Sequence, residues 1–304
     1  MTLTEAPAAT PAGPPPAVQP DATAASVPGW LRISLAVSLV FTVLMVFLAV
    51  YAVGLSALQE QRSQHQLYAK LRGLLSPSSE IAPPVGGVIS PGTPVALISA
   101  PDAGIDRDVV VEGTSSADLL AGPGLLRDSA LPGQYGQSVL IGKSVTAGSP
   151  FRRIDRLAIG DPITVTTAQG TFHFTVIDHR ATSSAPPEVP AGGALLTLVS
   201  ATGSGWLSAL APEHLLYVDA KLAGAPVAAP PGRPLAVPAS ELPGNDDPGV
   251  WPYLILWLQG LLLAAVAVVW SWTRWGRRQT WLVGTPLLVA VMWGVADTAM
   301  RLVP

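Results

Sequence analysis

The stretch Ser138-Val-Leu-Ile-Gly-Lys-Ser-Val-Thr-Ala-Gly-Ser-Pro-Phe-Arg-Arg153 decides how the middle of this chain folds. It opens with a short apolar run that stops at Gly142, and a second run, Thr197-Leu-Val-Ser-Ala201, has a similar composition. Short runs of β-branched and apolar residues between glycine, proline and aspartate are typical of strands. Several more such runs lie between residues 93 and 222, and together they predict a small β-barrel or sandwich.

One hairpin is predicted inside this region. Residues 163–167 and 171–177 are rich in valine, isoleucine, threonine and phenylalanine, and only Ala168-Gln-Gly170 separates them. A short connection that contains glycine is common between two antiparallel strands. We therefore expect these two runs to pair with each other.

The first two stretches resemble the catalytic core of sortases, the membrane-anchored cysteine transpeptidases of Gram-positive bacteria. The family usually reads Gly-His-Arg at the first stretch and Thr-Leu-x-Thr-Cys at the second, whereas this chain has Gly142-Lys143-Ser144 and ends the second at Ala201. The family's oxyanion-stabilising arginine normally opens the last strand, where this chain reads Glu213-His214-Leu215. The resemblance implies a degenerate member that lacks the catalytic His, Cys and Arg.

The order of segments between residues 94 and 222 also resembles the family, in particular actinobacterial class E-like sortases. The resemblance implies a mainly β fold, a sortase-like eight-stranded β-barrel with short helices. The segments that carry it are, in order, residues 95–99, 108–114, 116–124, 131–134, 150–157 and 170–176.

The absence of cysteine decides the expected chemistry. In the family the cysteine thiolate attacks the peptide carbonyl, the histidine handles the leaving-group proton and the arginine stabilises negative charge. The chain has no cysteine at all, so no relocated thiol can replace the one missing at Ala201. We expect a sortase-like pseudoenzyme without cofactor, and no metal site, since His173 and His179 lack ligand spacing.

An enzyme of altered mechanism is the alternative. Ser200 precedes Ala201, and a lysine with a lowered pKa can act as the base for a serine. A hydrolase or transpeptidase would then use Ser200 with Lys143, or Ser200 with His214. Against this, Ser200 fills the family's usual threonine position, and alternation along a strand points it away from Ala201.

Composition predicts an integral membrane protein. Mean hydropathy is +0.43 and only 12% of residues are charged, about half the share of a soluble domain. A crossing needs ~20 apolar residues, and three segments qualify by length or nearly so. We expect transmembrane helices at residues 31–58, 250–272 and 281–300, the first as a retained signal anchor because its apolar core is too long for a cleaved signal peptide. The tryptophans that flank the last two segments suit interfacial anchors.

Three arginines orient the chain. Arg274, Arg277 and Arg278 lie in the short basic loop 273–280, and such clusters stay on the cytoplasmic side. The sortase-like domain, residues 94–222, is then extracytoplasmic and the protein is a multi-pass protein of the cell membrane. Arg62, Lys70 and Arg72 beyond the first span oppose this orientation, but the tight arginine loop outweighs them.

The remaining segments are expected to connect these parts. Residues 1–30 form a Pro/Ala-rich tail, which lacks the apolar surface for folding and is expected to be disordered in the cytoplasm. Residues 59–93 form a juxtamembrane helix that ends near Ser76-Pro77 and a loose stalk. Residues 223–249 contain too many prolines for a helix or a central strand and are expected to form a semi-rigid linker.

The expected partner is a sorting-signal-like peptide or a protein of the cell envelope. A net charge of −3 and a pI near 5.8 give no basic surface for nucleic acid. The expected groove residues are Lys143, Ser144, Ser200, Ala201 and His214, with Lys143 favouring an acidic group of the ligand. The alternative is that the barrel is only a spacer between membrane anchors.

Overall fold

The computed structural model describes the chain in two units, residues 1–43 and 44–304. Within them it describes residues 29–51, 54, 56–76, 83–144, 146, 148–181, 184, 187–189, 192–202, 214–243, 249–274 and 277–302. Most of the expected N-terminal tail lies outside these residues. The first unit holds most of helix α1 (Gly29–Val50), which begins the predicted signal anchor.

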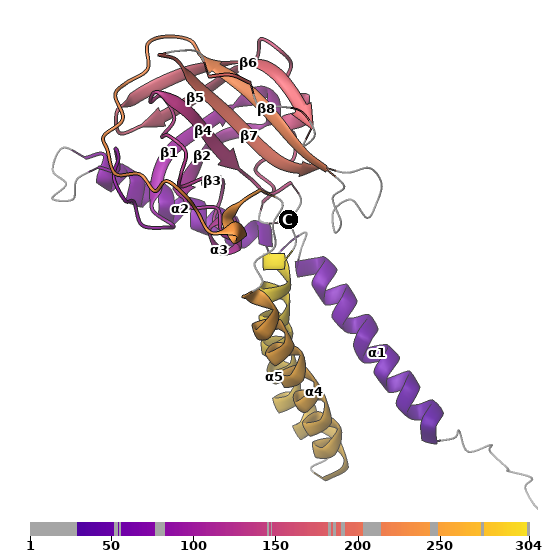
Figure 1. Cartoon of the computed structure of the whole chain (residues 1–304). Coiled ribbons are helices and arrows are strands. Elements are labelled where there is room, and N and C mark those ends of the chain that lie inside the picture. The colour runs from indigo at the N-terminus through magenta and orange to yellow at the C-terminus, as the bar shows by residue number, and fades with distance from the viewer. Residues whose placement is uncertain are drawn as a thin grey trace, which may run out of the picture. The chain divides into compact units, whose positions relative to one another are not determined.

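Eight strands close into one barrel in the order β1-β2-β3-β4-β7-β8-β6-β5, as predicted (Figure 1). Most neighbours are antiparallel, but β2 with β3 and β4 with β7 are parallel. The predicted hairpin is present as β5 and β6, which pair from Pro162 to Thr175. The strands are β1 (Pro94–Ala100), β2 (Ile105–Glu112), β3 (Gly124–Leu125), β4 (Gly136–Ile141), β5 (Pro162–Thr167), β6 (Gly170–Ala181), β7 (Ala194–Thr202) and β8 (His214–Leu222).

The barrel interior is filled by apolar side chains from every long strand. Ile98, Leu140, Val165 and Leu198 are fully buried in this core. Close packing makes such positions sensitive, and a leucine-to-alanine change there costs about 2–5 kcal/mol. A buried ion pair also joins neighbouring strands, since Arg180 on β6 donates to Asp219 on β8 at 2.5 Å.

Helix α2 (Ser56–Leu74) lies against the barrel beside β1 and β2 (Figure 1). The Gln64 side chain holds it there, because its amide oxygen accepts from the Val109 N–H at 2.7 Å and its amide nitrogen donates to the Val109 carbonyl at 3.2 Å. Leu71, farther along α2, is buried as well. Short elements complete the domain: α3 (Ser116–Leu119) and the 3-10 turns η2 (Pro101–Ala103) and η3 (Ile154–Arg156).

Two long apolar helices, α4 (Val250–Arg274) and α5 (Arg277–Leu302), pack side by side (Figure 1). Both are long and apolar enough to cross a membrane, over residues 250–271 and 278–302. Helix α5 begins four residues before the expected span at 281, since nothing in Arg277 to Thr280 breaks a helix. Gly294 permits a close approach, because a Cβ there would lie 2.6 Å from the Trp257 ring.

Residues 223–243, expected to form part of a linker, run along the barrel surface; we call this segment the strap. Val227 forms a β-bridge with Gln134, and a short 3-10 turn, η4 (Ala239–Glu241), lies near the end of the strap. The stalk is also fixed where it is described, since Ile89 is buried and the Val85 carbonyl accepts from the Gln134 amide at 2.7 Å. Proline excludes regular strands here, but it does not prevent side-chain and bridge contacts.

Candidate functional site

The two motif stretches meet because β4 and β7 are parallel neighbours. Their register pairs Val139 with Thr197 and Ile141 with Val199, so both stretches end at the same rim of the barrel. The Gly142 N–H continues this pairing beyond β4 by donating to the Val199 carbonyl at 3.0 Å. Glycine is required at this point, because a Cβ on residue 142 would lie 2.5 Å from the buried Phe151 ring.

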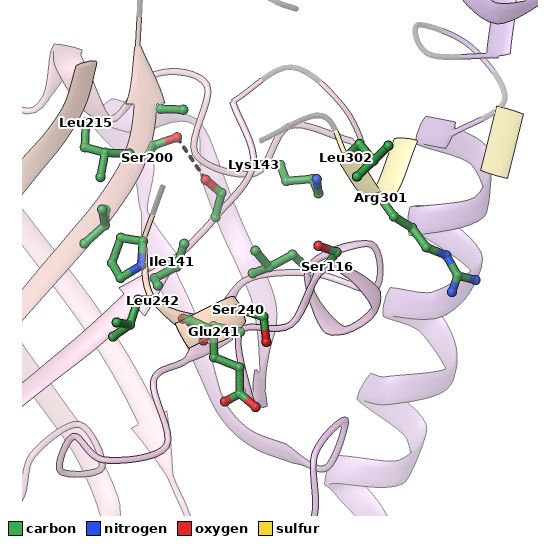
Figure 2. Close-up of a pocket in the computed structure, with 16 residues that line it drawn as sticks. Ser116, Ile141, Lys143, Ser200, Leu215, Ser240, Glu241, Leu242, Arg301 and Leu302 are labelled. Carbon is green, nitrogen blue, oxygen red and sulfur yellow. Dashed lines mark hydrogen bonds between the residues drawn. The ribbon is translucent and has the colours of Figure 1, made fainter. Parts of the chain in front are cut away.

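A cavity lies at this rim (Figure 2). Its volume is about 60 Å³, which is smaller than a typical small-ligand site, and it is partly open to solvent. Its walls are mostly apolar with a few hydroxyl and cationic groups. The lining residues are Thr114, Ser116, Leu119, Ile141, Gly142, Lys143, Val199, Ser200, Ala201, Leu215, Ser240, Glu241, Leu242, Pro243, Arg301 and Leu302.

Ala201 and Ser200 both border the cavity, although alternation along the strand was expected to turn Ser200 away. Ala201 is 8% exposed and offers only a methyl group to the cavity. The Ser200 hydroxyl donates to the Gly142 carbonyl at 2.9 Å, across the parallel pair (Figure 2). The Ser200 hydroxyl proton is therefore used in a hydrogen bond to the backbone, at the end of the β4–β7 pairing.

Lys143 is the buried cation of the cavity, with 3% of its surface exposed. Its ammonium donates to the Met300 carbonyl at 3.4 Å, in the last turn of α5. The last carbonyls of a helix lack partners within the helix and attract cations. Burial lowers the Lys143 pKa to about 8, because desolvation disfavours the charged form.

The other two expected groove residues do not line the cavity. Ser144 is half-buried in the loop after β4, and His214 is exposed at the first position of β8, where it pairs with Thr202. Among the described residues, no group of three or more His, Cys, Asp or Glu side chains could hold a metal ion. His173 instead contacts the Thr164 hydroxyl at 3.3 Å across the hairpin.

Two walls of the cavity come from parts that sequence reasoning left out. Ser240 to Pro243 of the strap form one, and Arg301 and Leu302 at the end of α5 form another (Figure 2). The Arg127 guanidinium donates to both oxygens of the Glu241 carboxylate, from Nη2 to Oε1 at 2.6 Å and from Nε to Oε2 at 2.8 Å. No local pattern marks these residues, because their contacts join positions more than a hundred residues apart.

Comparison with known families identifies the barrel. The family model "Sortase domain" matches residues 98–205, which include both motif stretches and most strands. The chain carries a sortase domain. The chain has no cysteine and places Ala201 at the end of the second motif, which fits a degenerate form of this domain. A comparison with curated proteins finds no match.

Solved sortase structures are similar to about half of the chain. The Sortase D5 transpeptidase of Clostridium perfringens is 24% identical over 54% of this chain and 98% of its own, with a TM-score of 0.42. The sortase SrtA of Actinomyces oris is 26% identical over 47% and 87%, with a TM-score of 0.38. A variant of sortase E from Streptomyces avermitilis is 25% identical over 45% and 91%, with a TM-score of 0.37.

Proposed function

We propose that this chain is a non-catalytic sortase-domain protein of the cell membrane, which binds a peptide or an envelope protein outside the membrane. The observation that carries the proposal is the cavity that remains at the rim of the barrel although the nucleophile position is Ala201. A barrel that served only as a spacer would have no need of a pocket at this place. Apolar walls with a few convergent polar groups are typical of a binding site.

The charges at the cavity favour a ligand with an acidic group. Lys143 and Arg301 both line it, whereas the carboxylate of Glu241 is engaged by Arg127. Arg301 in turn pairs with Asp297 at 3.0 Å, one turn earlier on α5. Lys143 is the more deeply buried of the two cations, and a charge acts more strongly where water is excluded.

A serine enzyme is the second candidate function, and the low pKa of Lys143 is the observation that favours it. Ser200 and Lys143 line the same cavity, and a lysine with a pKa of about 8 is partly neutral near physiological pH. Both groups, however, donate to backbone carbonyls, Ser200 to Gly142 and Lys143 to Met300. Each would have to leave its partner before proton transfer between them.

A turnover assay tests the choice between binding and catalysis. We expect the full-length protein in detergent micelles neither to cleave nor to transpeptidate sorting-signal peptides, with an intact sortase as the positive control. The Ala201→Cys variant should stay inactive as well, because Lys143 and His214 stand where the family has histidine and arginine. Turnover that disappears in Ser200→Ala or Lys143→Ala would establish the serine enzyme instead.

A capture experiment tests the ligand site itself. Wild-type protein and a Lys143→Glu variant would be incubated with fluorescent peptides that end in a carboxylate or in an amide. Preferential binding of the carboxylate form, lost in Lys143→Glu, supports the proposal. Equal behaviour of both peptides and both proteins would favour the spacer interpretation.

A further inference from the structure

The strap is fixed to the barrel along its length rather than at one point. Near its start the Val227 N–H donates to the Gly133 carbonyl at 2.9 Å, and the Val227 carbonyl accepts from the Tyr135 N–H at 3.2 Å. Further on, Pro230 packs so closely on Gly86 that a Cβ there would lie 2.7 Å away. These contacts guide the strap across the barrel surface toward the cavity.

Two ion pairs hold the second half of the strap. Arg233 pairs with Glu112 at 3.0 Å, and Arg127 pairs with Glu241 through two hydrogen bonds. Glu112 is fully buried and Glu241 is 7% exposed. The Glu241 backbone is held too, because its carbonyl accepts from the Thr114 hydroxyl at 2.6 Å.

The Arg127–Glu241 pair sets which side of the strap faces the cavity. Its two parallel hydrogen bonds fix the orientation of the Glu241 carboxylate. The paired carboxylate also raises the pKa of Arg127. The glutamate side chain points away from the other labelled groups of the cavity, while Ser240 and Leu242 stand beside it (Figure 2). The strap thereby presents the turn η4 and the two residues after it, Leu242 and Pro243, to the rim where β4 and β7 end.

We propose that residues 239–243 of the strap are a peptide ligand supplied by the chain itself, which occupies one side of the groove of the sortase domain. An external peptide enters the groove only after the Arg127–Glu241 pair opens and the strap moves away. The inference rests on the proposed function in treating the groove as a peptide site. It adds that a segment of the same chain occupies the site, and that the Arg127–Glu241 ion pair holds this segment in place.

The absence of cysteine provides a direct test of access. In an Ala201→Cys variant of the full-length protein, the introduced thiol is the only one and lies in the wall of the cavity. We would measure its rate of modification by a bulky maleimide. Thr171→Cys, at an exposed position on β6, gives the rate of a freely accessible thiol.

Release of the strap should expose the thiol. We expect Ala201→Cys to react slowly and Ala201→Cys with Arg127→Ala to react roughly 10- to 100-fold faster, because removal of one partner leaves a buried charge unpaired. The matched control is Arg156→Ala, which removes an exposed arginine from η3 and should leave the rate unchanged. The charge swap Arg127→Glu with Glu241→Arg should restore the slow rate.

A peptide in trans completes the test. A synthetic peptide with the sequence of residues 237–243 should slow modification in the Arg127→Ala background, while a scrambled peptide should not. Should Arg127→Ala fail to fold, Leu242→Ala with Pro243→Ala weakens the same wall and leaves both ion pairs intact.

Equal modification rates of the Ala201→Cys thiol with and without Arg127→Ala would overturn the inference. So would a modification rate in Ala201→Cys that matches the rate in Thr171→Cys. Because the maleimide rates of these variants are measured without an external ligand, their outcome is separate from that of the turnover and capture assays.

Discussion

At the scale of single residues, Lys143 is a buried cation beside the last turn of α5. Its folded-state pKa of about 8 lies below the 10.5 of an unfolded chain, so between these pH values the unfolded state binds more protons. Stability therefore rises with pH across this window. Relative to a Lys143→Met variant, wild-type protein should gain about 1–3 kcal/mol between pH 7.5 and 10.

Thermal unfolding of the full-length protein in one detergent, followed over a pH series, measures this gain. Lys221→Met is the matched control, because Lys221 is exposed on β8 and its removal should leave the pH dependence unchanged. Parallel curves for wild type and Lys143→Met would show that Lys143 is not desolvated in the folded protein.

The motif comparison predicted the site residues only in part. Lys143, Ser200 and Ala201 line the cavity because they follow or end two strands whose pairing fixes their place. His214 was expected beside them, but it is exposed at the start of β8. A sequence motif gives the position along a strand, whereas exposure depends on the packing around its end.

At the scale of elements, α2 and the neighbouring strand β2 carry two carboxyl groups with raised pKa values, buried Glu60 and half-buried Asp108. Burial and the neighbouring charge of Asp108 raise the pKa of Glu60 from 4.5 to about 7, and burial raises that of Asp108 from 3.8 to about 6. Raised carboxyl pKa values mean that the folded state binds more protons. The stability from this source is present at low pH and is lost as pH rises through about 6 to 7.

We therefore expect α2 to be held more firmly at pH 5 than at pH 8. Hydrogen exchange of its amides, corrected for the intrinsic pH effect, should be slower at the lower pH. Glu60→Gln should remove most of this difference, whereas Glu188→Gln, at an exposed position, should not. A difference that persists in Glu60→Gln would assign the pH effect to another group.

The strap shows why elements without periodicity are hard to predict. Its prolines correctly excluded a helix or a central strand, and the sequence then favoured a linker. The contacts that fix it, such as Arg233 with Glu112, are specific pairs between distant positions. They have no local pattern, in contrast to the barrel strands, whose apolar alternation reflects burial on one face.

At the scale of the whole molecule, topology determines which compartment the groove faces. By the positive-inside rule we expect Arg274, at the end of α4, and Arg277 and Arg278, at the start of α5, to lie in the cytoplasm. If the first apolar segment also crosses the membrane, we expect residues 94–222 and the strap to lie outside the cell. Reporter fusions at Gly232 and Gly276 should then report opposite compartments, with the Gly232 fusion active only as an extracytoplasmic reporter.

The effect of these three arginines can be separated from that of the other basic residues by substitution. Replacing all three loop arginines with glutamine should weaken the orientation of the Gly276 fusion, because short basic loops dominate insertion. Replacing Arg62, Lys70 and Arg72 should leave it unchanged or strengthen it, since these residues oppose the proposed orientation. If both fusions of the unsubstituted protein report the same compartment, α4 does not cross the membrane, and a groove that meets extracytoplasmic peptides would need a different arrangement of spans.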